Sequence, residues 1–391
     1  MKDEIQDFIT RFGPRPAGSE AERKAQEHVA NQMLRYTDDV QVLPFQSYLT
    51  AKFGKMKGYA MLYMVTLVVF WFSPFAAMII SLINTTVLIC DLMRNDGIAD
   101  FLFPKRTSWN VTATLEPQGE VKSTLIFSGH MDSTNECTWW YRFKQYGAHL
   151  TIMAGLVIAF FAFFLVWYVA ADYFIYDDMP PYSFYIYLAF VVLSPVTIIY
   201  FTFHGDIVVD GACDNLSGVV LAKNIVSSFA DPIHRGKSTL TNTRLRFISF
   251  GSEEKGLRGS TEYVAAHLHQ LIDDNSHLIN IDSVRNPDEI SIITGEMMSF
   301  VAFDKFLIGE TQKAFQAKSI PVKTGMLPMG GTDAIPFQQK NIPALSIIGM
   351  NMKSLDPTYH TRLDTIDNVD QKALDYTKTA LLELVAQWDK M

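Results

Sequence analysis

Three long stretches of the chain contain no charged residue, and they constrain its fold more than any other feature. In the 391-residue sequence they cover residues 58–90, 150–171 and 179–205. A helix needs about 20 apolar residues to cross a bilayer. The second and third stretches meet that length, and a short acidic turn joins them. The sequence therefore predicts a transmembrane helical hairpin inserted at residues 149–203.

The first stretch, residues 58–90, is too long for one ordinary crossing and short for two, and Pro74 lies near its middle. If the segments on both sides of this insert belong to one domain, the chain must return to the side that it left. Proline ends or kinks a helix. We predict an apolar helical insert of two short helices hinged at Pro74. A membrane-embedded pair of helices that does not cross is an open alternative.

The basic residues near the ends of the apolar stretches predict an orientation. Lys52, Lys55 and Lys57 precede the first stretch, and Arg142 and Lys144 precede the second. The turn between the second and third stretches carries aspartates and no basic residue. Cytoplasmic flanks of membrane helices are enriched in Lys and Arg. The sequence thus predicts an integral membrane protein whose globular part faces the cytoplasm, with the lipid bilayer as one partner.

The rest of the chain alternates between patterns of apolar residues typical of helices and of strands. Residues 19–36 have helical periodicity, residues 243–250 resemble a buried strand, and residues 371–390 are again helical. Such alternation indicates an α/β fold with a mostly parallel mixed sheet covered by helices on both faces. We assign residues 1–57, 91–148 and 204–391 to this one domain.

Charge and cysteine content exclude several classes of protein. The formal net charge is −8, so no nucleic-acid partner is expected. Cys90, Cys137 and Cys213 are far apart in sequence and form no C-x-x-C motif. This spacing argues against a disulfide framework and against a cysteine zinc site.

Histidines and carboxylates follow the predicted strands. In open α/β sheets, binding sites form at the carboxyl ends of the strands, so polar residues at those ends are candidates for function. Singly, each has a structural explanation as a turn cap or a solvated helix start. Together they form a candidate site. Its members are His130, Asp132, Asp214, Glu253, Glu254, Asp282 and His360.

These residue types indicate a metal site. Imidazole and carboxylate oxygen bind Zn²⁺ or a similar divalent ion without cysteine. Two histidines and three carboxylates suffice for two ions that share a bridging carboxylate, the arrangement of many two-metal hydrolases. The adjacent Glu253 and Glu254 suit two different roles: one binds metal, and the other accepts a proton from the attacking water. Asp132 is placed to accept the free ring N–H of His130 and fix its tautomer.

Seven stretches, in this order along the chain, resemble the co-catalytic zinc aminopeptidase family. Its relatives include bacterial leucyl aminopeptidases, glutamate carboxypeptidase, the glutaminyl cyclases and the catalytically inactive transferrin receptor. The resemblance covers almost everything except the apolar inserts. The stretches are "RFGPRPAGSEAERKA", "SGHMDS", "GACDNLSG", "SFGSEEKGLRGS", "NIDS", "GGTDAIPFQQKNIPALSI" and "YHTRLDT".

The resemblance implies a role for each matched residue. His130 and Asp282 would hold one zinc ion, Glu254 and His360 the other, and Asp214 would bridge the two ions. Other divalent metals could take the place of zinc. The resemblance further implies a cis peptide after Asp214.

The remaining roles implied by the resemblance are catalytic. Glu253 would act as the general base on a water that bridges the metals, and would then pass the proton to the leaving amine. Tyr359 would donate a hydrogen bond to the developing oxyanion, although a tyrosine here could also be a packing residue. Asp132 would orient His130.

The sequence therefore predicts a membrane-anchored, zinc-dependent exopeptidase that hydrolyses N-terminal residues from peptides. Two alternatives remain open on the same fold. One is a glutaminyl cyclase-type acyltransferase, which needs one zinc and no attacking water. The other is a non-catalytic membrane binding scaffold, which would be expected to lose metal ligands. The soluble relatives lack the long apolar insert that follows His130, so this insert could influence which substrates reach the site.

Overall fold

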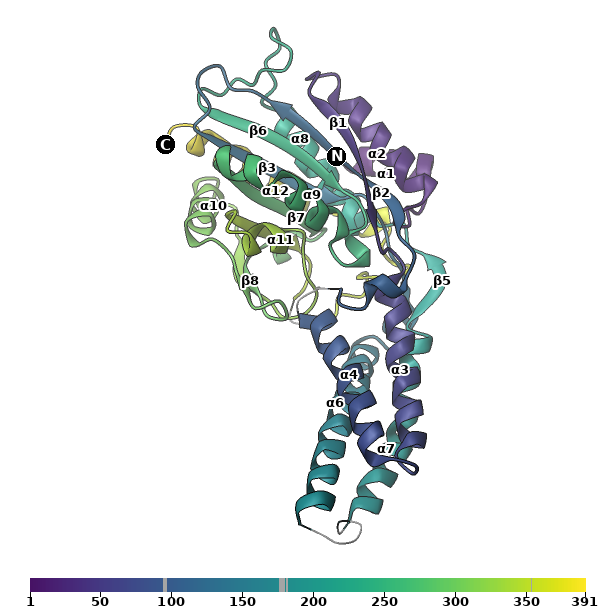
Figure 1. Cartoon of the computed structure of the whole chain (residues 1–391). Coiled ribbons are helices and arrows are strands. Elements are labelled where there is room, and N and C mark those ends of the chain that lie inside the picture. Colours follow the sequence, from purple (N-terminus) through teal and green to yellow (C-terminus); the bar gives the residue numbers. More distant parts are fainter. Residues whose placement is uncertain (94–96, 176–179, 181, 353) are drawn as a thin grey trace. The chain divides into compact units, whose positions relative to one another are not determined.

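The computed structural model describes the whole chain except residues 94–96, 176–179, 181 and 353 (Figure 1). Contacts divide the chain into two compact units. The first unit comprises residues 1–49, 105–136 and 207–391, and the second comprises residues 50–104 and 137–206. The second unit contains both apolar stretches, residues 58–90 and 149–203, and extends beyond each of them. The assignment of residues 58–90 and 149–203 as membrane inserts stays a prediction.

A nine-stranded mixed sheet forms the centre of the first unit. The strand order is β1-β2-β6-β3-β7-β11-β8-β10, and β9 pairs with β8. The strands are β1 (Val40–Ser47), β2 (Arg106–Leu115), β3 (Ser123–His130), β6 (Thr243–Phe250), β7 (Ser276–Val284), β8 (Ser291–Glu296), β9 (Val301–Ala302), β10 (Lys323–Leu327) and β11 (Ala344–Gly349).

The four central strands β6, β3, β7 and β11 run parallel to one another. Antiparallel strands β1 and β2 extend the sheet on one side, and β8 joins β11 antiparallel on the other. All residues of β3 and β7 are buried, as expected for strands that are covered on both faces. The parallel centre brings the carboxyl ends of three strands to one edge, and the candidate site lies there.

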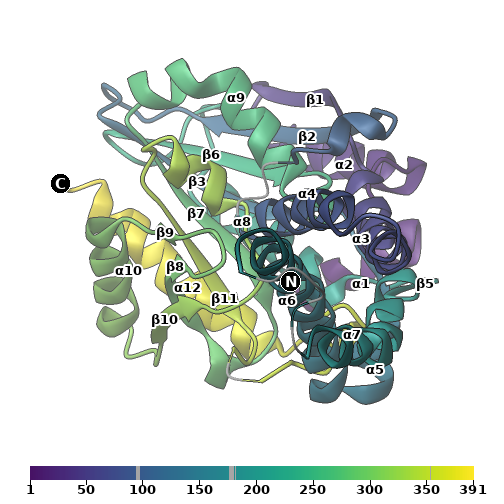
Figure 2. The same ribbon diagram turned by 60° about the horizontal axis from the view of Figure 1, so that its bottom comes forward.

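Helices cover both faces of this sheet (Figures 1 and 2). Helix α8 (Ser217–Ser227) contacts β3 and β7 and packs beside α12 (Gln371–Trp388). Helix α9 (Arg258–Asp273) and the short α11 (Ala334–Gln339) lie together on the other face (Figure 1). Helices α1 (Lys2–Phe12), α2 (Glu20–Met33) and α10 (Lys305–Ala317) complete the unit. The predicted α/β fold class is confirmed.

Side-chain caps fix where several of these helices begin. The Ser19 hydroxyl accepts a hydrogen bond from the N–H of Glu22 at the start of α2, as the serine before that helix predicts. Asp304 and Asp370 cap α10 and α12 in the same way. These caps satisfy backbone donors that have no partner within the helix.

The second unit consists mainly of apolar helices. They are α3 (Ala51–Val69), α4 (Pro74–Met93), α6 (Gln145–Phe174) and α7 (Ser183–Thr197), with the shorter α5 (Thr138–Phe143) before α6. The stretch around residues 58–90 thus forms two helices, and Pro74 is the first residue of the second, a position that proline tolerates well. Strands β4 (Asn135–Cys137) and β5 (His204–Val208) pair as a separate two-stranded sheet.

In the part of the chain that the structure describes, three helical segments are long and apolar enough to cross a membrane: residues 74–92, 145–174 and 183–201. Aromatic side chains pack between the helices of this unit; Phe70 stacks on Tyr187, with ring centroids 4.8 Å apart. Many large apolar side chains point outward instead, and Phe72 is 84% exposed. An apolar surface of this kind is what a bilayer would cover.

A matched pair of isoleucine substitutions tests the core of the sheet. Ile248 in β6 is fully buried, whereas Ile233 is 81% exposed in the same unit. Ile248→Ala should lower the free energy of unfolding by about 2–5 kcal/mol because it removes packed methyl groups and leaves a cavity. Ile233→Ala should change it by less than about 1 kcal/mol. Chemical denaturation of the full chain in detergent measures both, and equal losses would contradict the assigned core.

Candidate metal centre

The candidate site lies where three parallel strands end. His130 is the last residue of β3, and Asp282 lies near the carboxyl end of the neighbouring strand β7. Glu253 and Glu254 follow β6, the strand on the other side of β3. Because these strands are parallel, their carboxyl ends bring the four side chains to one edge of the sheet.

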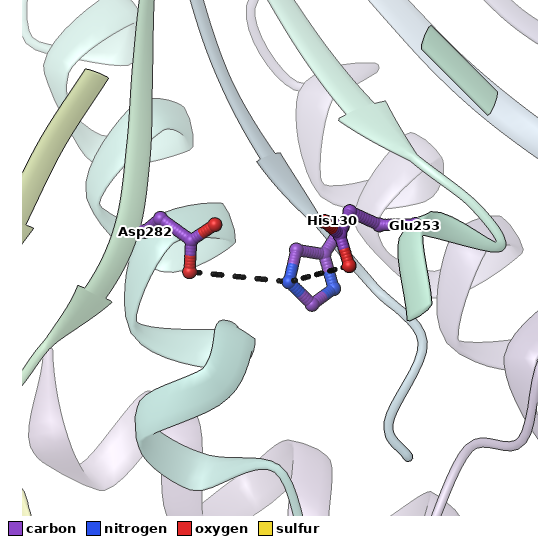
Figure 3. A group of neighbouring side chains, drawn as sticks. All are labelled: His130, Glu253 and Asp282. Atoms are coloured by element: carbon purple, nitrogen blue, oxygen red, sulfur yellow. Dashed lines mark ion pairs between the residues drawn. The ribbon is translucent and has the colours of Figure 1, made fainter. Parts of the chain in front are cut away.

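The structure gathers the five predicted ligands, together with the predicted base Glu253, into two groups of three. His130, Glu253 and Asp282 form the first group (Figure 3), and Asp214, Glu254 and His360 form the second. Within each group the potential ligand atoms all lie within 4.8 Å of one another. A histidine with two carboxylates is a donor set that suits zinc. The residues thus fit a metal in each group, and which atoms hold it stays a prediction.

Asp214 lies between the two histidines. One of its carboxylate oxygens is 3.0 Å from Nε2 of His130, and the other is 3.3 Å from Nε2 of His360. Nε2 of His360 is also 3.3 Å from the Glu254 carboxylate. A carboxylate that faces both groups, with one oxygen toward each, is positioned as a bridging ligand would be. The expected cis peptide between Asp214 and Asn215 is present.

The contact between Asp132 and His130 differs from the predicted one, in which the Asp132 carboxylate accepts the ring N–H of His130. Nδ1 of His130 lies 3.1 Å from the backbone carbonyl oxygen of Asp132 and 3.5 Å from its carboxylate. The carboxylate accepts hydrogen bonds from the backbone N–H groups of Glu253 and Glu254, at 2.9 and 3.1 Å. The carbonyl is therefore the nearer partner of the ring, while the side chain holds the two glutamates in place.

Tyr359 packs directly against a predicted ligand. Its ring stacks on that of His360, with centroids 3.9 Å apart and planes inclined by 26°. Burial raises the pKa of the Tyr359 hydroxyl well above its ordinary value, and the neighbouring charge of Asp214 adds to this effect. The hydroxyl therefore keeps its proton at neutral pH and can donate a hydrogen bond.

Burial and mutual repulsion dominate the electrostatics of the site. Burial raises the pKa of Glu253 well above its ordinary value; His130 opposes this, while Glu254 and Asp333 add to it. Burial likewise raises the pKa of Asp282 to about 7. These pKa shifts are those of the protein residues without a bound cation. A divalent cation would favour the charged forms.

The pKa values of Asp214 and His130 shift in the directions expected for an ion pair. Burial would raise the pKa of Asp214, but hydrogen bonds from His130 and His360 outweigh it and lower the pKa well below its usual range. Burial would lower the pKa of His130, but the carboxylates of Glu253, Asp132 and Asp214 raise it well above its ordinary value.

Two buried carboxylates near the site were missed by the sequence reasoning. Asp364 accepts hydrogen bonds from the backbone N–H groups of Cys213 and Asp214, at 2.6 and 3.2 Å. Asp333 is fully buried, and its charge acts on Glu253. Both lie in stretches that carry the family resemblance, "YHTRLDT" and "GGTDAIPF". Their position in those stretches was the signal that could have identified them. They were missed because neither residue directly follows a strand.

The fold is shared with solved zinc aminopeptidases. The zinc aminopeptidase BSAP from Bacillus subtilis superposes with a TM-score of 0.55 at 15% identity, covering 99% of this chain and 93% of that one. An aminopeptidase from Aneurinibacillus sp. strain AM-1 gives a TM-score of 0.56 at 16% identity, with coverages of 99% and 93%. The glutaminyl cyclase of Porphyromonas gingivalis gives 0.54 at 14% identity, with coverages of 99% and 98%.

The fold of this chain is thus that of solved zinc aminopeptidases. Residues 194–385 match the model of peptidase family M28. A stretch of 205 residues is 27% identical to Aminopeptidase YwaD of Bacillus subtilis (strain 168), covering 49% of this chain and 42% of that protein. The chain thus spans less than half the length of this relative. The family resemblance seen in the sequence is confirmed.

The raised carboxylate pKa values predict how pH affects the metal-free protein. Asp282 and Asp333 have a pKa of about 7 when folded, against about 4 in an unfolded chain. Between these values the folded state binds more protons than the unfolded state, so stability falls as pH rises. Each such proton changes the free energy of unfolding by about 1.4 kcal/mol per pH unit. The raised pKa of His130 acts in the same direction.

Thermal unfolding of the chelator-treated chain at pH 5 and pH 8 measures this effect, and the unfolding temperature should be lower at pH 8. Zinc competes with protons for Asp282 and His130, so saturating zinc should raise the unfolding temperature more at pH 8 than at pH 5. A metal-free protein that is more stable at pH 8 would contradict the assignment of these carboxyl groups as buried and mutually repelling.

Proposed function

We propose that the chain is a membrane-anchored, zinc-dependent aminopeptidase that removes N-terminal residues from peptides. The observation that carries this proposal is the convergence of two histidines and four carboxylates into two adjacent groups, with Asp214 between them. The M28 family match and the aminopeptidase relatives support it.

Each residue has a chemical task in this proposal. Two zinc ions, when bound, polarise the scissile carbonyl and make water nucleophilic near neutral pH. Glu253 accepts the proton of the attacking water and returns it to the leaving amine. Tyr359 donates a hydrogen bond to the developing oxyanion. Asp132 holds the backbone of Glu253 and Glu254, which keeps the base and its neighbour in a fixed relation.

The arginines near the site favour an aminopeptidase over a carboxypeptidase, which must bind a substrate carboxylate. The Arg15 guanidinium donates to three backbone carbonyl oxygens. Arg362 donates to the buried carboxylate of Glu136, with two N···O distances of 2.7 Å. Both side chains are thus engaged within the protein.

Substitution of the proposed base tests the mechanism. Glu253→Gln should lower kcat for an aminoacyl anilide by about 10²–10⁴-fold, because the amide cannot accept the proton. Its zinc content, measured by atomic absorption, should equal that of the wild type. Glu120→Gln, in an exposed loop of the same unit, is the control and should change neither quantity. Loss of zinc in Glu253→Gln would show that Glu253 is a ligand and not the base.

Glutaminyl cyclases share the fold, so the reaction itself must be tested. The proposal predicts two zinc ions per chain and chelator-sensitive release of N-terminal residues from a peptide library. The same preparation should not convert peptides with N-terminal glutamine to the cyclised product with release of ammonia. One zinc per chain together with cyclisation would favour the acyltransferase, and full zinc loading with neither activity would favour a binding scaffold.

Membrane anchoring is the second part of the proposal, supported by the three apolar helical segments. We expect the chain to stay in the pellet after carbonate extraction of membranes. In a Cys90→Ser background, Glu120→Cys should react with a membrane-impermeant maleimide from the cytoplasmic side, and Tyr182→Cys, 77% exposed beside α7, from the opposite side. Labelling of both from one side would contradict a crossing hairpin.

A further inference from the structure

The stretch "RFGPRPAGSEAERKA" carries the family resemblance but supplies no predicted ligand and no catalytic residue. It contains two ionisable side chains that are fully buried, Arg15 and Glu22. Burying a charged group costs several kcal/mol unless hydrogen bonds replace its water. The partners of these two side chains therefore indicate what the stretch does.

Arg15 connects the loops that carry two of the predicted ligands. Its Nε donates to the backbone oxygen of Met131, at 2.9 Å, and Met131 directly follows His130. One terminal nitrogen donates to the oxygen of Gly211, at 3.1 Å, three residues before Asp214. The other donates to Gly13, at 2.8 Å, within its own segment. A planar guanidinium can hold carbonyl groups in several directions at once, which an ammonium cannot do with the same geometry.

The backbone of Arg15 adds two further hydrogen bonds to the loop after His130. The Arg15 N–H donates to the Ser133 hydroxyl at 3.0 Å, and the Ser133 N–H donates to the Arg15 oxygen at 2.9 Å. Residues 131–133 are thus bound from the guanidinium and from the main chain of the same residue. This leaves the loop after His130 little freedom to move.

Glu22 does the same for the loop that carries the paired glutamates. Its carboxylate accepts hydrogen bonds from the N–H of Ser252 at 3.0 Å, the N–H of Gly18 at 2.6 Å and the hydroxyl of Ser108 at 3.0 Å. Asp132 accepts the next two N–H groups, those of Glu253 and Glu254. Two buried carboxylates therefore hold three consecutive amides.

The conformation of Ser252 shows why the loop needs such support. Its φ is +57°, in the left-handed region that non-glycine residues seldom adopt. Conformations of this kind persist where the surrounding structure determines them, and they are frequent at functional sites. The hydrogen bond from the Ser252 N–H to Glu22 provides that constraint one residue before the proposed base.

We propose that Arg15 and Glu22 are positioning residues of the metal centre, which set the backbone of the His130, Asp214 and Glu253–Glu254 loops and thereby the spacing between the two ligand groups. The inference rests on the proposed metal site. Neither side chain belongs to the two ligand groups. Outer partners of metal ligands typically change metal affinity or activity by about 10–100-fold when they are replaced.

Arg246 provides a matched control for Arg15. It is also a buried arginine of the first unit, but it lies in β6 toward the end remote from the site, and its partners are the side chains of Thr114 and Asp274. Arg246→Lys should affect folding stability as any buried arginine substitution would. It should leave the metal centre unchanged.

The experiment measures metal binding by the full chain in detergent. Zinc affinity is obtained by competition with a chromophoric chelator, and the visible absorption of the Co²⁺-loaded protein reports ligand geometry. Arg15→Lys and Glu22→Gln should each weaken zinc binding about 10-fold or more and shift the Co²⁺ absorption bands. Each should lower kcat more than it changes KM, while Arg246→Lys should match the wild type in affinity and spectrum.

The outcomes separate this inference from the proposed function. If the wild type binds neither zinc nor Co²⁺, the proposed function fails. If the wild type binds metal and both variants bind it with wild-type affinity and spectrum, the positioning role is overturned, even if their unfolding temperatures fall. Should Arg15→Lys not yield folded protein, Glu22→Gln decides alone, because it keeps the size of the side chain and one acceptor oxygen.

Discussion

Repulsion between buried carboxylates is the interaction on which the site depends. Asp214, Glu253, Glu254 and Asp282 converge at one edge of the sheet together with His130 and His360. Burial raises the pKa of most of these acids, so the protein residues alone do not hold the site in its fully charged form. Bound cations would relieve the repulsion. Burying several carboxylates close together is unfavourable without metal and becomes favourable when cations bind. This is the electrostatic property expected of a metal centre.

Candidate ligands at the ends of strands could be located from the sequence because the end of a strand is a local property. His130 and Asp282 lie at or near the carboxyl ends of two parallel strands that are buried along their whole length. That rule says nothing about which oxygen faces which nitrogen. The grouping of Glu253 with His130, and the closer approach of the Asp132 carbonyl than of its carboxylate, depend on side-chain rotamers and loop geometry. These features become visible only in three dimensions.

The supporting residues were hidden for a different physical reason. Arg15 and Glu22 bind backbone groups that are more than 100 residues away in the sequence. Because residues of every type carry a backbone carbonyl group, and all but proline an N–H, the sequence does not show which of these groups is bound. Asp364 holds the amides before and at Asp214 in the same manner. From the sequence alone, a buried charged residue whose partners are main-chain atoms cannot be distinguished from a charged residue on the surface. The family resemblance marked these stretches without showing what they do.

The same backbone restraints explain how the chain accommodates a long apolar insert directly after a predicted ligand. Between His130 and the start of the helical unit lie only residues 131–136. Arg15 binds Met131 and Ser133, and the buried carboxylate of Glu136 accepts hydrogen bonds from both the side chain and the backbone N–H of Arg362. Because Arg362 is two residues beyond His360, this last pair also ties the loop to the second ligand group. The short connection is thus held at its beginning, middle and end by other residues of the first unit, which restrain the backbone next to His130.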